Sequence, residues 1–377
     1  MYPIHKFLFV LVVSAFLILP AARVLSQTQE KPLTSSEFVG LLYMIPRNPQ
    51  KRDDLIEEIR RRGIGFALTD GMRGLVSTKS GNDVLLRRTL EEAERRRVNP
   101  TAAALPSETE GRELLERTRN VTLAAANAMP DFLVKQIIKR SYAFGNTGTW
   151  KPHDNITLAV GYRANAGEEY RLLTLNGMPV PDEVRNSSDY TKYAPGATSS
   201  GVEYVSSVAN LFKPESQAEF KVVDTDTIQN RRTVVYEYAV KRDNSTLQLI
   251  ASGARAIVGS RGRLWIDREL DRVLRFEQIA TEIPGDFPMT AASTLIDYDW
   301  VSINERKYLL PTHSVVLITS REAQQIVQDR NDIRFRSYQK YGAELKVIDE
   351  VGEDDEPVEP ETPPKPPKTD KPIRPPQ

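Results

Sequence analysis

The chain has 377 residues, of which 40% are hydrophobic and 27% are charged, so it is long enough for two or three domains with buried cores. Lysine plus arginine equals aspartate plus glutamate at 51 each, and this balance gives no reason to expect nucleic acid or an acidic substrate as a partner. Cysteine is absent, which excludes disulfides, a thiol nucleophile, thiolate metal ligands and lipidation on an N-terminal cysteine.

Residues 1–26 have the pattern of a secretory signal peptide. A short basic stretch precedes an apolar run from Phe7 to Leu19, and small residues follow as far as Ser26. The run is shorter than the roughly 20 apolar residues that span a bilayer. We therefore expect cleavage after Ser26 rather than an uncleaved anchor, and an exported mature protein without a transmembrane span.

Residues 33–98 are expected to form four short helices. Apolar residues recur in this block at helical spacing, as a small helical core requires. Helix-starting residues divide the block: Thr34 with Glu37 as a capping box, Asn48-Pro49, Thr69-Asp70, and Ser80 as the cap of the last helix.

The polar faces of these helices are rich in arginine, at Arg60–Arg62 and Arg95–Arg97. Such clusters could bind an anionic polymer or lipid headgroups. The alternative is a solvated helix face with partners one turn away, such as Glu57 with Arg61, and charge runs on helices favour this second interpretation.

The stretch RRRGIGFALTDGMRGLVSTKSGNDVLLRRTLEEA, residues 60–93, resembles a small helical module found in many bacterial multidomain proteins. It departs from the usual pattern at Ser80, where a "GA" phrase is replaced. The resemblance implies an accessory interaction module without chemistry of its own.

A different pattern begins after residue 98. Residues 99–108 are expected to be a linker, because prolines flank small residues without periodicity. A helix from about 109 to 128 follows, and alternation of apolar and polar residues then continues to about 340. One-sided strands in series predict an antiparallel sheet with one covered face, on which a short helix at 201–212 is expected to lie.

The stretch LWIDRELDRVLRFE, residues 264–277, places three acids, Asp267, Glu269 and Asp271, between two apolar runs. A calcium loop of the D-x-D-x-D type needs glycine at its sixth position, where a count from Asp267 gives Arg272. A glycosidase-like pair needs two acids that face each other across a cleft. We therefore interpret the stretch as a hairpin whose turn acids face solvent.

This hairpin also resembles the strand-turn-strand of exported half-barrel proteins related to the bacterial lipoprotein-localisation carriers LolA and LolB. Further phrases follow in the matching order over about 109–340, among them MPDFLVKQIIKR, VEYVSSVANLF and STLIDYDWVSINERKYLLPT. The resemblance implies an α+β fold over 109–345, a curved antiparallel half-barrel with covering helices, in the periplasm or cell envelope of a bacterium. The chain departs from these carriers in its helical module, its tail and its lack of a lipobox cysteine.

The resemblance implies that the concave apolar face can hold an acyl chain. Aromatic residues with polar tips suit a site that holds a chain and orients a headgroup. On the return strand of the hairpin, alternation places Leu274 and Phe276 on one face. The alternative is that these aromatic residues are ordinary core. The predicted ligand-binding residues are Tyr162, Tyr236, Tyr238, Phe276, Tyr298 and Trp300.

Residues 346–377 are expected to be a disordered tail, first acidic and then proline-rich and basic. Together with the helical module, the tail is a candidate for binding an envelope protein or a cell-wall polymer.

We expect no cofactor, no metal site and no enzyme. Outside the predicted signal peptide the histidines are His153, which we place in a loop, and His313, which we place in a strand, and no HExxH, GxSxG or P-loop motif is present. The leading hypothesis is an envelope protein that binds a lipid or other apolar ligand. The alternatives are a structural or assembly factor that acts through the module and tail, and a hydrolase in which the two histidines share a cleft with acids.

Overall fold

The computed structural model describes residues 31–48, 51–100, 104–145, 149–164, 166–187, 190–194, 205–251, 253–322 and 325–341. The predicted signal peptide (1–26) and the predicted tail (346–377) lie outside these described residues.

Four helices form the N-terminal module: α1 (Ser35–Leu42), α2 (Lys51–Arg62), α3 (Asp70–Ser80) and α4 (Val84–Val98). They enclose a core of their own that includes Phe38, Ile59 and Leu90. Thr34 and Glu37 form the predicted capping box on α1.

The prediction that Ser80 caps the fourth helix is wrong. The N-cap of α4 is Asp83, whose carboxylate accepts a hydrogen bond from the Leu86 amide at 2.7 Å, whereas Ser80 is the last residue of α3. Gly81 and Asn82 both have positive φ, at 64° and 61°. These two left-handed residues turn the chain between the helices, so the capping position falls at Asp83.

After α5 (Glu108–Asn127), the chain builds an eleven-stranded antiparallel sheet in the described part of the molecule, in the order β4-β3-β2-β1-β13-β12-β11-β10-β9-β6-β5. The strands are β1 (Phe132–Phe144), β2 (Lys151–Arg163), β3 (Gly167–Leu175), β4 (Met178–Pro179), β5 (Glu219–Ile228), β6 (Arg231–Val240), β9 (Gly259–Asp267), β10 (Val273–Thr281), β11 (Met289–Ile303), β12 (Arg306–Glu322) and β13 (Gln325–Lys340). A separate hairpin pairs β7 (Gln248–Ala251) with β8 (Ala254–Ile257).

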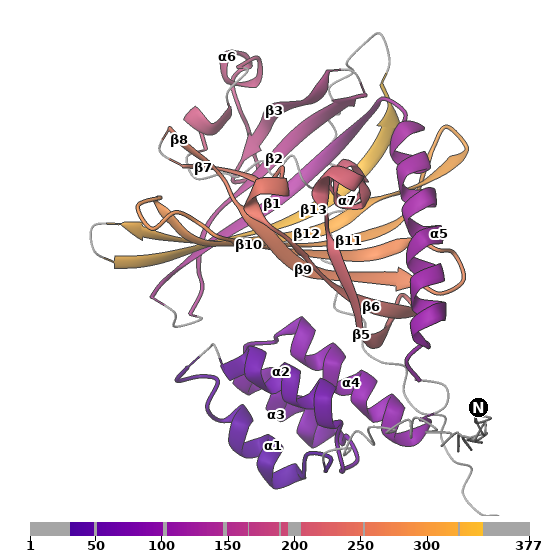
Figure 1. The fold of residues 1–377 in the computed structure, drawn as a ribbon. Coiled ribbons are helices and arrows are strands. Elements are labelled where there is room, and N and C mark those ends of the chain that lie inside the picture. The colour runs from indigo at the N-terminus through magenta and orange to yellow at the C-terminus, as the bar shows by residue number, and fades with distance from the viewer. Residues whose placement is uncertain are drawn as a thin grey trace, which may run out of the picture.

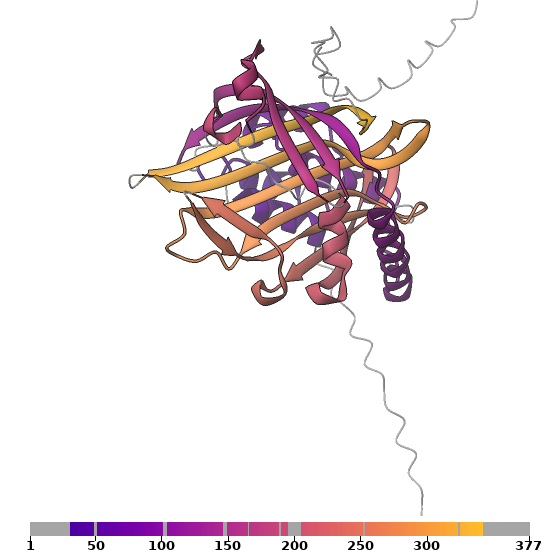
Figure 2. The same ribbon diagram turned by 90° about the horizontal axis from the view of Figure 1, so that it is seen from above.

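The sheet is curved and open, with β4 and β5 as its two edges (Figures 1 and 2). This architecture confirms the predicted fold class, α+β with an unclosed antiparallel half-barrel and covering helices. Strand β5 is the next strand of this sheet after β4 in the sequence, yet the two strands lie at opposite edges. The segment that connects them therefore has to cross one face of the sheet.

The described parts of this crossing segment include α6 (Asp182–Arg185), α7 (Val205–Phe212) and two 3₁₀ helices, Tyr190–Lys192 and Pro214–Ser216. Val208 and Phe212 of α7 join the apolar cluster on the inner face, which also contains Leu114 of α5. The predicted short helix therefore lies on the sheet, next to α5 (Figure 1).

Helix α5 approaches the sheet closely at Gly111. A Cβ atom added there would lie 2.9 Å from Cγ2 of Val222, which is too close for any side chain. The Gly111 carbonyl oxygen accepts a hydrogen bond of 2.7 Å from the Tyr236 hydroxyl. The glycine therefore fixes how deeply the first half of α5 lies against β5 and β6.

A β-bulge places Leu274 and Phe276, which we predicted on one face, on opposite faces of the sheet. The pairing of β10 with β9 shifts register between Val273 and Arg275, and a shift of one residue moves later side chains to the other face. Leu274 packs with Trp265 in an outer cluster, whereas Phe276 belongs to the inner cluster with Leu264. The prediction that Leu274 and Phe276 share a face is therefore wrong.

The helical module lies on the outer face of the sheet, opposite α7 (Figure 1), and ion pairs connect the two. Asp224 of β5 pairs with Arg60, at 3.0 Å, and with Arg96. Asp226, two residues on, pairs with Arg88 at 3.2 Å. Arg60 and Arg96 therefore do not belong to the solvated face that we preferred, because the sheet supplies a buried carboxylate for them. Arg61 and Arg97 do pair with acids one turn away, Glu58 and Glu94, as that interpretation expects.

Glu92 on α4 makes the reciprocal contact. Its side chain is 1% exposed and lies 3.0 Å from Nη2 of Arg232, and the Thr225 hydroxyl donates a further hydrogen bond to it. Burial raises the pKa of Glu92, but the hydrogen bonds from Arg232 and Thr225 outweigh this and lower it. The charges at this interface therefore alternate between the two partners, which fixes the orientation of the module.

Asp226→Ala should loosen the docking of the module. The change removes the acceptor of both the Arg88 pair and the Trp265 indole N–H, which donates to Asp226 at 3.0 Å. Removing one partner of a buried ion pair costs about 3–5 kcal/mol. We expect chemical denaturation to show a clear loss of stability, and proteolysis in the linker 99–108 to become faster. Glu219→Ala, at an exposed position of the same strand, is the control, and equal behaviour of the two variants would contradict the interface described above.

The turn of the β9–β10 hairpin is less exposed than its sequence suggests. Asp267 is 1% exposed; it accepts hydrogen bonds from the backbone amides of Glu269 and Leu270, at 2.8 and 2.9 Å, and pairs with Arg231. The prediction that all three turn acids face solvent is therefore wrong for Asp267. It is also wrong for Asp271, whose side chain is 21% exposed and pairs with Arg117 at 3.0 Å. It is correct for Glu269, whose side chain is 85% exposed.

Asp267→Asn should destabilise the protein by about 2 kcal/mol, because the buried charge beside Arg231 is lost and one of the two accepting oxygens is replaced by an amide nitrogen that cannot accept. Glu269→Gln should remain within about 0.5 kcal/mol of the wild type, as surface substitutions usually do. Urea denaturation of both variants measures the difference. Equal stabilities would mean that the buried carboxylate does not hold the turn.

Candidate functional site

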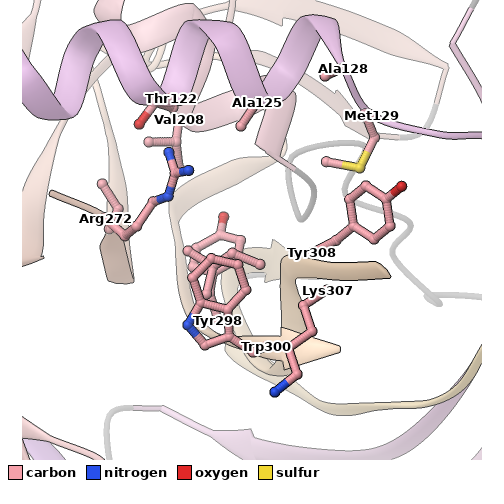
Figure 3. Close-up of a pocket in the computed structure, with 12 residues that line it drawn as sticks. Thr122, Ala125, Ala128, Met129, Val208, Arg272, Tyr298, Trp300, Lys307 and Tyr308 are labelled. Atoms are coloured by element: carbon pink, nitrogen blue, oxygen red, sulfur yellow. The ribbon is translucent and has the colours of Figure 1, made fainter. Parts of the chain in front are cut away.

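A cavity of about 160 Å³ lies between α5 and the inner face of the sheet (Figure 3). Along α5, Thr122, Ala125 and Ala128 recur every three residues, so short side chains line one face of the helix there. These side chains do not fill the space between helix and sheet. The lining residues are Thr122, Ala125, Ala128, Met129, Val208, Arg272, Val273, Tyr298, Trp300, Lys307, Tyr308 and Leu309.

Aromatic side chains form the wall opposite α5. Tyr298 is buried in the inner apolar cluster, and Trp300, two residues further along β11, is 40% exposed. Tyr308 faces Met129 on one side of the cavity (Figure 3). The cavity is therefore apolar inside and has an amphipathic indole at its opening to solvent.

Two cationic side chains, Arg272 and Lys307, also line the cavity, whereas none of the lining residues is acidic. Figure 3 shows the Arg272 guanidinium beneath α5, near Thr122 and Val208, and the Lys307 amine pointing away from α5 beyond Trp300. Burial lowers the pKa of Arg272, and the charge of Asp271 opposes that effect. The cavity thus has a net positive lining.

The predicted ligand-binding residues lie at three places. Tyr298 and Trp300 line the cavity. Tyr236 hydrogen-bonds to α5, and Tyr238 stacks on Phe276 with ring centroids 5.8 Å apart, all within the inner cluster. Tyr162 packs in a second inner cluster, stacked on Phe132 at 5.0 Å. A ligand-binding role for the six residues remains a prediction.

Burial also shifts the pKa of two of these tyrosines. It raises the pKa of Tyr236 and, well above the ordinary value, that of Tyr238. A phenol is already neutral at physiological pH, so burial extends the pH range in which both tyrosines remain hydrogen-bond donors.

Several lining residues were not predicted from the sequence, notably Arg272, Lys307, Met129 and Ala125. The small residues of α5 at three-residue spacing were a recognisable pattern, because a helix face of alanine and threonine leaves space against a sheet. The lining role of Arg272 could not be predicted, since it depends on the turn conformation before β10, where Asp271 has φ of 53°.

The two histidines do not share a cleft. His153 lies in β2, not in the predicted loop, and His313 lies in β12. Strands β1 and β13 separate β2 from β12, which corresponds to roughly 14 Å at the usual strand spacing. The arrangement that the hydrolase hypothesis requires is therefore not present between these two residues.

His313 lies between two carboxylates. Its Nε2 atom is 2.9 Å from Asp332, and its Nδ1 atom is 3.8 Å from Asp297. Asp297 also accepts a hydrogen bond of 2.7 Å from Arg275, whose guanidinium lies over the Trp265 ring. Burial alone would lower the pKa of His313, but the hydrogen bonds and charges of Asp297 and Asp332 raise it to about 9.

Two further observations concern the described part of the chain as a whole. No group of three or more histidine, cysteine, aspartate or glutamate side chains in it could hold a metal ion. Its helices include none with the length and apolar character needed to cross a membrane.

No protein-family profile matches the sequence, and no curated protein matches it either. Among solved structures, a LolA superfamily protein from Nitrosomonas europaea is similar at 10% identity with a TM-score of 0.26, over 63% of this chain and 97% of the other. A DUF1329 family protein from Desulfovibrio piger is similar at 10% identity with a TM-score of 0.29, over 61% and 92%. The MucA/MucB complex from Pseudomonas aeruginosa gives 9% identity and a TM-score of 0.17, over 59% and 98%.

The LolA resemblance stated from the sequence thus recurs among the structural matches.

The raised pKa of His313 should make stability fall in mildly alkaline solution. A histidine with a raised pKa stabilises the fold fully below its unfolded value of about 6.5, and this contribution is lost as the pH rises through about 9. Thermal denaturation between pH 6 and 10 should show this decline in the wild type and a smaller one in His313→Gln. His153→Gln is the control and should follow the wild type. Parallel curves for all three proteins would contradict the ion-pair description of His313.

Proposed function

We propose that this protein is a non-enzymatic binding protein of the bacterial cell envelope, which holds the apolar part of a lipid or similar ligand between α5 and the concave sheet. The observation that carries the proposal is the cavity itself, with small residues on the helix side and aromatic residues on the sheet side. Such a lining favours an apolar ligand.

The volume of the cavity limits what enters it. About 160 Å³ is close to the size of an engineered apolar cavity that holds benzene, so it fits the end of an acyl chain but not a whole one. Roughly five buried carbons contribute about 4 kcal/mol, which corresponds to a Kd of about 1 mM. Binding of this kind is weak and reversible.

Tighter binding requires more of the ligand's acyl chain to lie beneath α5. Two polar contacts that hold this helix, Gly111 with Tyr236 and Arg117 with Asp271, lie in its first half. The cavity lies under its second half, at Thr122 to Ala128. A displacement of the second half would extend the cavity along the sheet while the first half stays attached.

The assembly-factor hypothesis is the second candidate, and the small cavity favours it, because pockets for drug-sized ligands usually measure about 300–1,000 Å³. Against it stands the engagement of Arg60, Arg88 and Arg96 by the sheet. These arginines are not available to an anionic polymer while the module is docked.

Ala125→Trp should abolish the binding of an apolar probe such as N-phenyl-1-naphthylamine, because the indole would fill the cavity. Ala124→Trp is the matched control, since the neighbouring residue on the same helix faces solvent, and it should bind the probe like the wild type. Probe fluorescence measures both affinities, and circular dichroism checks the fold.

Mass spectrometry of organic extracts from gently purified protein complements this test. If the wild type binds no apolar probe and its extract contains no lipid, the binding hypothesis is wrong and the assembly-factor hypothesis takes its place. If the wild type and both variants bind equally well, the ligand site lies elsewhere on the protein.

A further inference from the structure

Arg272 is partly buried, and its charge is compensated differently from that of three arginines whose side chains are more deeply buried. Arg140 pairs with Asp154, Arg275 with Asp297 and Arg60 with Asp224, each at 3.0 Å or less. The Nη1 atom of Arg272, in contrast, is buried and makes no hydrogen bond within the described part of the chain.

The carboxylate of the neighbouring residue Asp271 does not serve as the partner of Arg272. Asp271 lies next to Arg272 in the chain, but its Oδ2 atom accepts a hydrogen bond of 3.0 Å from Nε of Arg117 on α5. A buried donor without a partner is costly, and more so when it carries charge. An acceptor that enters the cavity would satisfy this donor.

The surroundings of Arg272 select a negatively charged acceptor. The lining contains a second cation, Lys307, and no carboxylate. Figure 3 shows the Thr122 hydroxyl close to the Arg272 guanidinium, and the aromatic rings of Trp300 and Tyr308 further along the cavity. The Arg272 guanidinium and the Thr122 hydroxyl thus lie at one side of the cavity, and the aromatic rings lie at the other, with Lys307 beyond Trp300.

We propose that the ligand is an anionic amphiphile, with a carboxylate or phosphate headgroup bound by Arg272 and an alkyl chain that lies against Trp300 and Tyr308. This inference rests on the proposed function and names the chemical class of its ligand. A guanidinium binds either headgroup through parallel N–H donors, and Lys307 adds a positive charge at the opposite side of Trp300 without enclosing the headgroup.

The test compares ligands that share one chain and differ in charge: decanoate, decyl phosphate, 1-decanol and decyltrimethylammonium, each titrated as monomer into the full-length mature protein. Both anions should bind at least about tenfold more tightly than the alcohol, as expected for one charge-assisted hydrogen bond, and the cation more weakly still. Inorganic phosphate alone should not bind measurably, because it lacks the chain.

The variants assign the preference to a residue. Arg272→Gln should reduce anion affinity about tenfold and leave the affinity for 1-decanol unchanged, which also shows that the cavity remains folded. Arg272→Lys should restore part of the preference. Arg306→Gln, which removes the same charge from an exposed position beside Lys307 and outside the lining, is the control and should bind all four ligands like the wild type.

The outcomes separate the two proposals. If 1-decanol and both anions bind equally well, or if Arg272→Gln keeps the full preference for anions, the headgroup assignment is overturned while the apolar-ligand function stands. If inorganic phosphate binds as well as decyl phosphate, the site binds an anion whether or not an alkyl chain is attached. The proposal of an anionic amphiphile is then wrong. If none of the decyl ligands binds, the proposed function itself fails.

Discussion

An open sheet with apolar residues on both of its faces has to be covered on both, and the rest of this structure depends on that constraint. In the region of β6, β9 and β10, Tyr236, Leu264 and Phe276 lie on the inner face, while Val235 and Trp265 lie on the outer face. Helices α5 and α7 cover the inner residues, and the helical module covers the outer ones, with Leu85 of α4 packed against the Trp265 cluster. The two covers differ in chemistry, because the inner contact is mainly apolar whereas the outer contact is mainly ionic.

The ionic contact serves orientation more than stability. Desolvation offsets much of the attraction in a buried ion pair, but an unpaired buried charge is strongly unfavourable. Asp224, Asp226 and Glu92 therefore allow one docked arrangement of the module and penalise others. Trp265 extends this network into the sheet, since its indole donates to Asp226 while Arg275 lies over its ring.

The sequence predicted the fold class well because alternation and helix-starting residues are local features. Thr34 with Glu37, the helix that α5 forms and the strand around Tyr162 all follow from residues near one another in the chain. Features that depend on contacts distant in sequence were not predicted. The bulge at Leu274 turned that side chain to the outer face of the sheet. Asp267 pairs with Arg231, and Arg60 pairs with a carboxylate 164 residues away in the sequence. The site shows the same division: Tyr298 and Trp300 were predicted as ligand-binding residues and both line the cavity, but the space beneath Ala125 exists only because α5 crosses the sheet there.

The β9–β10 turn connects α5, which covers the cavity, with Arg272, which gives the cavity a positive charge. Asp271 faces α5 and holds Arg117, and the next residue, Arg272, enters the cavity beneath the same helix. One peptide unit therefore separates the contact that attaches α5 from the cation that the proposed headgroup would bind. In that binding mode, a headgroup that attracts Arg272 also changes the field at Asp271, so occupancy and helix position act on the same turn. A ligand can shift the position of α5 only by as much as its affinity differs between the closed and displaced helix, and this turn is where such a difference can arise.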